Sequence, residues 1–409
     1  MSQSGSGAFR VIAVVCSIVI CSSLGVSSCS SIRETDPAAK FAAPIPIDLP
    51  VPSGSREAAV ASLAYSGSAW FAAGSFRDAA DQHHPGLWAS TDAVHWTQVM
   101  TVPVTYYGQI SELYSVAASV RGVVALGAAT GGAHGNPRTV SWILRQDGRL
   151  HEVVAGFELY NGVRQISVRS VAEGPRGWVI IGSRVDQNGR IGAASWTSPT
   201  GDDFTIHDDD ATLSSATTEQ IFGLDVAPIG DGVVAVGELT TFGATAGETD
   251  GIAWTSSDGA KWTRWTPAGL QLGGSGVQRP QRVASRGRRI LIAGTQSDGK
   301  RTSITAWSTI DGTTWSRTTV EPFGTSDDVL SAATAATVTS NGFVVAARQG
   351  GILRLATSVD GRTWTELPVG SGLPTGNRAG LTVQSNGDTL LIGVTSLSGG
   401  GLWRTTASQ

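Results

Sequence analysis

The sequence predicts an all-β fold, and within that class a seven-bladed β-propeller of four-stranded antiparallel blades. The chain of 409 residues contains 52 Gly and 13 Trp but only 2 Met, a composition typical of turns and strands rather than of long helices. One apolar segment recurs seven times, and a Trp-containing turn motif follows most copies. Because the interval between copies is about fifty residues, one ring of repeated units is expected rather than two or three unrelated domains.

The repeated apolar segment has the composition of a buried strand, because Val, Ile, Leu and small residues predominate and a Gly or Ala ends almost every copy. An alternating apolar segment precedes it, as at residues 60–65, and this is the expected inner strand of each blade. The seven copies, each the expected second strand of a blade, are residues 70–74, 123–127, 178–182, 233–237, 290–294, 343–347 and 390–393.

A second motif, Trp-x-(Ser/Thr)-x-Asp-(Gly/Ala)-x-x-Trp, follows the repeated segment after a polar loop. Three units contain it in full, at residues 88–96, 254–262 and 307–315. Other copies are altered, with Ala356 in place of the first Trp in the sixth unit and only Asp147-Gly148 remaining in the second. Because Asp-Gly between two strands is a strong hairpin signal, each motif is expected to join a third strand to an outer fourth strand.

These turns resemble the Asp-box, or BNR, repeat, whose usual form is Ser-x-Asp-x-Gly-x-Thr-Trp; the present motif is one residue shorter between Asp and Trp. The resemblance implies structural residues on the outer hairpins of separate blades. There the Asp accepts backbone N–H groups, the Gly takes a positive φ and the Trp covers the blade edge. A ligand site built from several carboxylates is the less favoured alternative. The residues concerned are Asp92, Asp147, Asp258, Asp311, Asp360, Trp96, Trp262, Trp315 and Trp364.

The seventh unit leaves no room for an outer strand, because only three residues follow Thr406. Residues 43–51 (APIPIDLPV) lie ahead of the first unit and have the apolar alternation and Pro content of an edge strand. We expect this segment to pair beside residues 402–406 and to close the ring, which removes an open sheet edge.

The N-terminal region predicts a membrane address. The apolar run at residues 11–26 is shorter than the roughly 20 residues of a membrane span, and Val26-Ser27-Ser28-Cys29 resembles the lipobox of bacterial lipoproteins. The resemblance implies a signal peptide over residues 1–28, acylation of Cys29, a flexible tether over 29–42 and the propeller over 43–409. The protein would then be lipid-anchored at the extracytoplasmic face of the cell membrane. An ordinary cleaved signal peptide and an uncleaved anchor are the alternatives.

Charge and cysteine content exclude several classes of protein. The 29 Lys and Arg nearly balance the 33 Asp and Glu, so neither a nucleic-acid binder nor a disordered acidic tail is expected. All three cysteines (Cys16, Cys21 and Cys29) precede the repeats, so no disulfide is expected within the propeller. We expect a monomeric propeller without a cofactor.

Ligands are expected on the face formed by the loops between second and third strands and by the connections between blades. His83, His84 and His134 lie in equivalent loops of neighbouring units and could approach one another as metal ligands. Solvated loop histidines are the favoured alternative, because no dense ligand spacing supports a metal.

Two further groups belong to the same face. Asp208, Asp209 and Asp210 lack the alternating ligands and Gly of a calcium loop, so a solvated acidic turn is expected. Tyr106-Tyr107 is the more interesting candidate, because exposed aromatic residues are enriched at sugar and protein contacts. Packing of one of the two rings under its loop is the alternative.

Two classes of function fit these features. The first is a binding or scaffold module for an envelope protein or glycan, which needs only a displayed face. The second is a glycoside hydrolase, because the Asp-box resemblance extends to sialidases. Against an enzyme, the Arg-Ile-Pro segment of sialidases is missing and the last Tyr of the sequence is Tyr160, which leaves no late Tyr nucleophile. The binding class is therefore expected.

Overall fold

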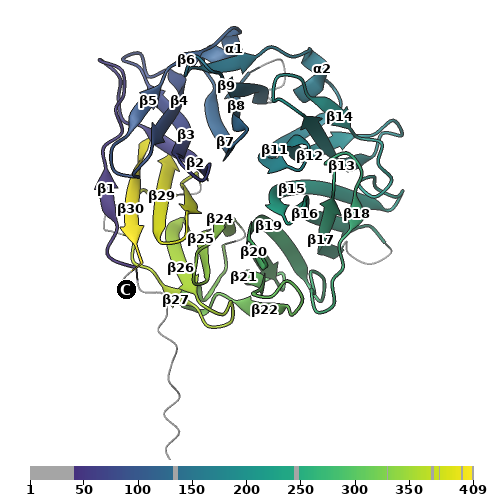
Figure 1. Cartoon of the computed structure of the whole chain (residues 1–409). Coiled ribbons are helices and arrows are strands. Elements are labelled where there is room, and N and C mark those ends of the chain that lie inside the picture. The colour runs from purple at the N-terminus through teal and green to yellow at the C-terminus, as the bar shows by residue number, and fades with distance from the viewer. Residues whose placement is uncertain are drawn as a thin grey trace, which may run out of the picture. The chain divides into compact units, whose positions relative to one another are not determined.

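The computed structural model of the protein describes residues 41–131, 137–243, 248–328, 330–369, 373–376, 378–397 and 399–407. Seven sheets surround a central axis, and each is one blade of a β-propeller (Figure 1). Four antiparallel strands build every blade, and short additional strands extend the second and fifth blades. The predicted fold class is confirmed.

The strands follow the same order in each blade, from the axis outwards. The inner strands are β2 (Ala59–Tyr65), β7 (Glu112–Ser119), β11 (Gln165–Gly174), β15 (Glu219–Ile229), β19 (Val277–Arg286), β24 (Ala332–Val338) and β28 (Gly380–Ser385). The second strands are β3 (Trp70–Arg77), β8 (Gly122–Thr130), β12 (Gly177–Val185), β16 (Gly232–Thr241), β20 (Arg289–Ser297), β25 (Phe343–Gln349) and β29 (Thr389–Ser396).

The remaining strands complete the blades. The third strands are β4 (His83–Ser90), β9 (Pro137–Leu144), β13 (Ile191–Ser198), β17 (Glu248–Ser256), β21 (Thr302–Thr309), β26 (Ile352–Ser358) and β30 (Gly399–Thr406). The outer strands are β5 (Thr97–Val99), β10 (Leu150–Val153), β14 (Thr205–His207), β18 (Thr263–Arg264), β22 (Ser316–Thr319), β27 (Thr365–Glu366) and β1 (Ile45–Ile47). The additional elements are β6 (Thr101–Val102), β23 (Thr325–Ser326), the one-turn helices α1 (Tyr106–Gln109) and α2 (Phe157–Tyr160), and the 3-10 turn η1 (Glu321–Phe323).

The N-terminal strand closes the ring as predicted. β1 pairs antiparallel with β30, with Ile45 opposite Arg404 and Ile47 opposite Leu402. The Thr405 hydroxyl also donates to the carbonyl of Ala42 at 2.6 Å. The seventh blade therefore takes three strands from one end of the chain and its outer strand from the other.

The repeated glycines do not end their strands, which corrects the prediction. β3 continues three residues past Gly74, and Gly74 lies opposite a bulge in β2 between Val60 and Ser62. A Cβ built on Gly74 would lie 1.8 Å from the carbonyl oxygen of Ala59. The glycine is needed there because the bulged inner strand approaches the backbone too closely for any side chain.

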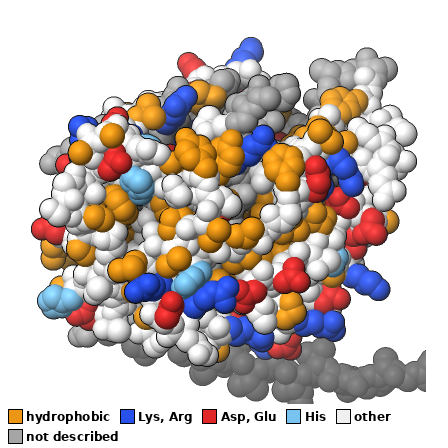
Figure 2. Space-filling model, turned by 90° about the horizontal axis from the view of Figure 1, so that it is seen from above, with side chains coloured by type: hydrophobic (Ala, Val, Ile, Leu, Met, Phe, Trp, Pro, Cys, Tyr) orange, Lys and Arg blue, Asp and Glu red, His pale blue; other side chains and the backbone are white. Residues whose placement is uncertain are grey.

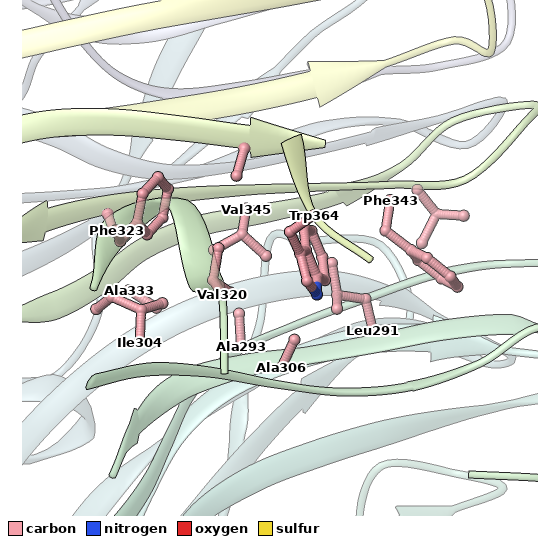
Figure 3. Packing of buried hydrophobic residues seen from close by; sticks show 13 residues of the cluster. Leu291, Ala293, Ile304, Ala306, Val320, Phe323, Ala333, Phe343, Val345 and Trp364 are labelled. Carbon is pink, nitrogen blue, oxygen red and sulfur yellow. The ribbon is translucent and has the colours of Figure 1, made fainter. Parts of the chain in front are cut away.

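Apolar side chains fill the spaces between neighbouring blades. Between the fifth and sixth blades, Trp364 from the outer turn packs among Leu291, Val345 and Phe343 (Figure 3). All four side chains are at most 5% exposed. Trp364 is thus held within the core, where the sequence predicted only that it covers a blade edge.

The first Trp of the repeated motif occupies one register position throughout. Trp88 lies opposite Ala72, and Trp142 lies opposite Ala125 at the same place in the second blade. The prediction omitted Trp142, because an extra residue in the following turn puts its Asp147 out of register with the motif. Both indoles are fully buried.

Side chains near the bulges tie the inner strands together around the axis. In five successive pairs of blades, a side-chain oxygen of one inner strand accepts a backbone N–H of the next. The acceptors are Ser62 for Val116, Ser115 for Val171, Ser170 for Val226, Asp225 for Val283 and Gln281 for Ala333, at 2.8–3.1 Å.

Candidate functional site

The aspartates of the repeated motif act within their own turns. Asp311 Oδ1 accepts the backbone N–H groups of Thr313 and Thr314 at 2.7 and 2.6 Å, and Gly312 has a φ of 79°. Asp92 accepts the corresponding two N–H groups at 2.8 Å, although Ala93 replaces the glycine. Asp147 accepts one such hydrogen bond, from the backbone N–H of Arg149. Each carboxylate is therefore occupied at the hairpin of a separate blade.

These bonds lower the carboxyl pKa values. For Asp92 the bond from the His95 side chain is the largest cause, and for Asp311 it is the N–H of Thr314. Partial burial opposes the shift at Asp258 and Asp360, but the turn N–H groups outweigh it and the pKa of each is lowered. The ionised form is thus favoured in the folded protein.

These shifts predict acid sensitivity. A carboxyl group with a lowered folded pKa contributes stability above its unfolded pKa, near 3.8, and loses that contribution as the pH falls through the folded value. We expect a nearly constant melting temperature from pH 7 to about 4.5 and a steep fall below about pH 4. Circular dichroism melts at each pH measure this.

The matched variant replaces Asp92, Asp258, Asp311 and Asp360 with Asn. Because Asn still accepts turn N–H bonds but does not titrate, the variant should melt lower at pH 7 and decline less below pH 4. An unchanged decline would show that other groups control acid unfolding.

The two described histidines of the opposite face belong to β4 rather than to a loop. His83 Nδ1 lies 3.3 Å from both Ser75 Oγ and Glu112 Oε2, and Ser75 Oγ lies 3.3 Å from the same carboxylate. A hydrolase relay needs its serine and its carboxylate on opposite ring nitrogens. Because both partners share Nδ1, this cluster does not form that relay.

His84 makes separate contacts, with Nε2 at 3.0 Å from Asp78 and Nδ1 at 3.1 Å from the carbonyl oxygen of Gln109. The bond to His84 is the main cause that lowers the pKa of Asp78. His134 lies outside the described residues. Within the described ranges, no group of three or more His, Cys, Asp or Glu side chains is placed to hold a metal ion.

The acidic triplet is largely engaged with its neighbours. Asp208 accepts from Arg164 at 2.8 Å and from the buried Arg184 at 3.1 Å. Asp210 Oδ2 accepts the backbone N–H of Trp262 at 3.1 Å, across to the next blade. Of the three aspartates only Asp209 is exposed, so the expectation of a solvated acidic turn applies to that residue alone.

Tyr106 and Tyr107 belong to a surface group, here named the aromatic ridge, with Arg138 and Phe157. The two Tyr rings meet edge to face at 5.4 Å, and the Arg138 guanidinium lies 6.0 Å from the Tyr107 ring and 4.8 Å from the Phe157 ring. Tyr106 is 64% exposed and Phe157 is 54% exposed. Tyr107 packs on Gly131, so one ring projects and its neighbour supports it.

A buried carboxylate holds the ridge in place. Glu152, only 5% exposed, accepts the backbone N–H groups of Val104 and Thr105 and the Thr105 hydroxyl, all within 2.8 Å. The Thr105 hydroxyl in turn caps α1 by accepting the N–H of Gly108 at 3.0 Å. A Cβ on Gly108 would lie 2.0 Å from Glu152, so this glycine permits the contact.

A groove of about 680 Å³ runs beside the ridge and includes Phe157. One wall is the segment from Val153 to Leu159, and the other includes Ile206 of β14. Arg164, Arg184 and Asp208 form the polar part of the lining. Figure 2 views the molecule onto the rim where α1 and α2 lie, and apolar side chains occur there in several groups with charged side chains around the margins of the view.

Sequence reasoning found Tyr106 and Tyr107 but missed Glu152, Arg138 and Phe157. The available signal was that Glu152 is the one acidic residue between Asp147 and Glu158 and directly precedes the apolar segment 153–157, because a buried charge requires partners. No local pattern marks Arg138, since only the folded chain brings it between rings from two different helices.

The predicted acylation site Cys29, the signal peptide and most of the tether lie outside the described residues. Within the part of the chain that is described, every helix is too short to cross a bilayer.

Comparison with known proteins identifies no family. No family model and no curated protein matches this sequence. Among solved structures, Pyrococcus horikoshii acylaminoacyl peptidase is 9% identical with a TM-score of 0.47, over 87% of this chain and 53% of that one. The β-propeller domain of the Trilobed protease from Pyrococcus furiosus is 10% identical with a TM-score of 0.46, over 87% and 97%. The present chain thus spans about half the length of the peptidase, and these similarities carry nothing about activity.

Proposed function

We propose that the protein is a lipid-anchored binding module that holds an envelope protein on the aromatic ridge, outside the cell membrane. The observation that carries this proposal is the ridge itself, in which the exposed rings of Tyr106 and Phe157 stand beside the partly buried Tyr107 and Arg138. Aromatic residues and Arg supply most of the binding energy at protein interfaces, and the adjoining groove offers room for a partner's side chain.

Rigidity of the ridge supports the same conclusion. Tyr106 lies on a helix that Glu152 and Thr105 fix from below, so little conformational entropy is lost when a partner binds. Glu152 accepts three hydrogen bonds from this segment, which compensate for its burial and fix the backbone that carries Tyr106.

The anchor completes the proposal. Cleavage before Cys29 and acylation would give more than one lipid chain, which binds membranes stably where a single chain does not. The fourteen tether residues 29–42 would span about 20 Å as a flexible chain, enough to let the propeller turn above the lipid surface. The repeated turns support placement among the non-catalytic Asp-box propellers.

The test compares Tyr106→Ala and Phe157→Ala with the wild type. The full-length protein is crosslinked in cells and the attached partner is quantified by mass spectrometry. Loss of a hot-spot side chain costs about 2 kcal/mol, so each variant should recover roughly 30-fold less partner. Phe242→Ala is the matched control, since Phe242 is 48% exposed but lies in the fourth blade.

Equal recovery by all three variants would reject the ridge as the binding surface. Recovery that disappears after enzymatic removal of glycans would identify a glycan rather than a protein. The anchor is checked in the same cells by Cys29→Ser, which should move the protein from the membrane fraction to the soluble fraction. Retention of that variant in membranes would contradict acylation.

A further inference from the structure

The inner strands of all seven blades line a central channel of about 720 Å³, separate from the ridge. The opening at the axis of the ring in Figure 1 is where β2, β7, β11, β15, β19, β24 and β28 face one another. Hydroxyl and amide groups, including Ser167, Gln165 and Thr382, make up much of the lining. This volume is typical of sites for small molecules.

Three charged side chains line the channel: Arg169, Asp225 and Arg282. Two guanidinium groups face a single carboxyl group, so the lining carries an excess of at least one positive charge. The whole chain has a net charge of −4, so this local excess is opposite in sign to that of the protein. Such a concentration of one charge inside a hollow attracts ions of the other sign.

The two arginines differ in their partners. Arg282 donates from Nε to the carbonyl oxygen of Thr334 and from a terminal nitrogen to that of Gln281, both at 2.7 Å. The Arg169 side chain makes no hydrogen bond or ion pair with any residue in the described ranges. By contrast, the next residue on β11, Ser170, accepts a hydrogen bond from the following blade. The five N–H donors of Arg169 are therefore available to a ligand.

The Arg169 side chain is exposed to the open channel, and the strands around the channel remove only part of its contact with water. Burial lowers the pKa of Arg169, and the like charge of Arg282 lowers it further. The equivalent bulge positions of five other inner strands carry uncharged residues, so the architecture does not require a charge at this height; they are Ala61, Tyr114, Leu224, Gln281 and Thr334. Because the fold does not demand a charge at this height and Arg169 is exposed to the channel, its guanidinium is placed to meet a ligand there.

We infer that the central channel binds a small monocarboxylate, whose carboxylate pairs with Arg169 and whose remaining polar groups meet the hydroxyl and amide lining. The planar fork of a guanidinium matches the two oxygens of a carboxylate. A monocarboxylate carries one negative charge, which balances the smallest positive excess of the lining. A phosphate dianion carries two negative charges and would be repelled more strongly by the carboxyl group of Asp225.

The experiment measures binding of paired probes to the purified propeller by calorimetry. The charged members are benzoate, phenylacetate and glucuronate, the neutral members are their amides, and inorganic phosphate is the divalent anion. At least one carboxylate should bind more than tenfold tighter than its amide and tighter than phosphate. Arg169→Gln should weaken that binding at least tenfold, because it removes the charge and the fork.

Two variants serve as controls. Arg264→Gln removes an exposed arginine from β18 and should leave carboxylate binding unchanged. Asp225→Asn keeps an acceptor for the N–H of Val283 but removes the acid, so it should tighten carboxylate binding severalfold. Without ligand, Arg169→Gln should melt no lower than the wild type, since it breaks no bond.

Several results would overturn the inference. These are equal binding of acids and amides, tighter binding of phosphate, and carboxylate binding that survives Arg169→Gln. A clear fall in the melting temperature of ligand-free Arg169→Gln would assign the side chain to stability instead.

Discussion

A propeller that begins at Pro52, without β1, should melt roughly 10 °C lower than one that begins at Phe41. The shorter chain loses the whole outer strand of the seventh blade, including three ladder positions opposite β30. Scanning calorimetry of the two proteins measures the difference. This is the largest effect that the structure predicts for a change outside the core.

The expected loss has two main sources. Ile47, Leu49 and Val51 pack against the core cluster that contains Trp88, and partial burial of three such side chains contributes about 3 kcal/mol. The Trp88 indole donates to the carbonyl oxygen of Pro50 at 2.7 Å, and removal of that acceptor leaves a buried donor unpaired, which costs about 1–3 kcal/mol more.

The chain that begins at Phe41 is the control, because it retains every contact of the closing segment within the described residues. Equal melting temperatures of the two proteins would mean that β1 does not stabilise the ring. The open edge of β30 should also make the shorter protein aggregate, which light scattering would detect.

The second large effect is expected for Gly294→Ala, which should destabilise the protein by about 3 kcal/mol in urea unfolding. A Cβ on Gly294 would lie 1.9 Å from the carbonyl oxygen of Arg279, and that oxygen belongs to the bulged inner strand. Relief of the clash must displace β19, and Arg282 on this same strand is bonded to the next blade.

Gly156→Ala is the matched control, because nothing lies within 4 Å of a Cβ built there and its φ of −58° suits any residue. The sixth blade already carries Ala347 at the position equivalent to Gly294, so local adjustment is possible in one blade. A change below about 0.5 kcal/mol at Gly294 would show that the fifth blade adjusts as easily.

Sequence patterns predicted the blade count, the strand order and the closing strand because these depend on local periodicity. Gly74 shows where such reasoning fails, since a glycine after an apolar run signals either a strand end or a close backbone approach, and only the partner strand distinguishes them. The predicted loop boundaries were wrong for the same reason. His83 was expected in a loop, but strand pairing extends β4 back to this residue.

The candidate sites were predictable only in part. Tyr106 is visible as an aromatic residue in a polar connection. Glu152 and Arg138 reach the same ridge through strand pairing, which no linear spacing reports. Arg169 is one polar residue in an alternating strand, and only the folded ring shows that its side chain has no bonded partner among the described residues.

Closure by β1 also sets the order of events during folding. The contact between Ala42 and Thr405 spans 363 positions, so the first strand of the ring to leave the ribosome is the last that can find its partner. Until the seventh blade exists, the backbone N–H and C=O groups of β1 have no strand to pair with. Contacts between residues so far apart in the sequence form slowly, and the intermediates that precede them are prone to aggregate. The unpaired edge of β1 is therefore open to wrong strand pairing until the last blade has been synthesised.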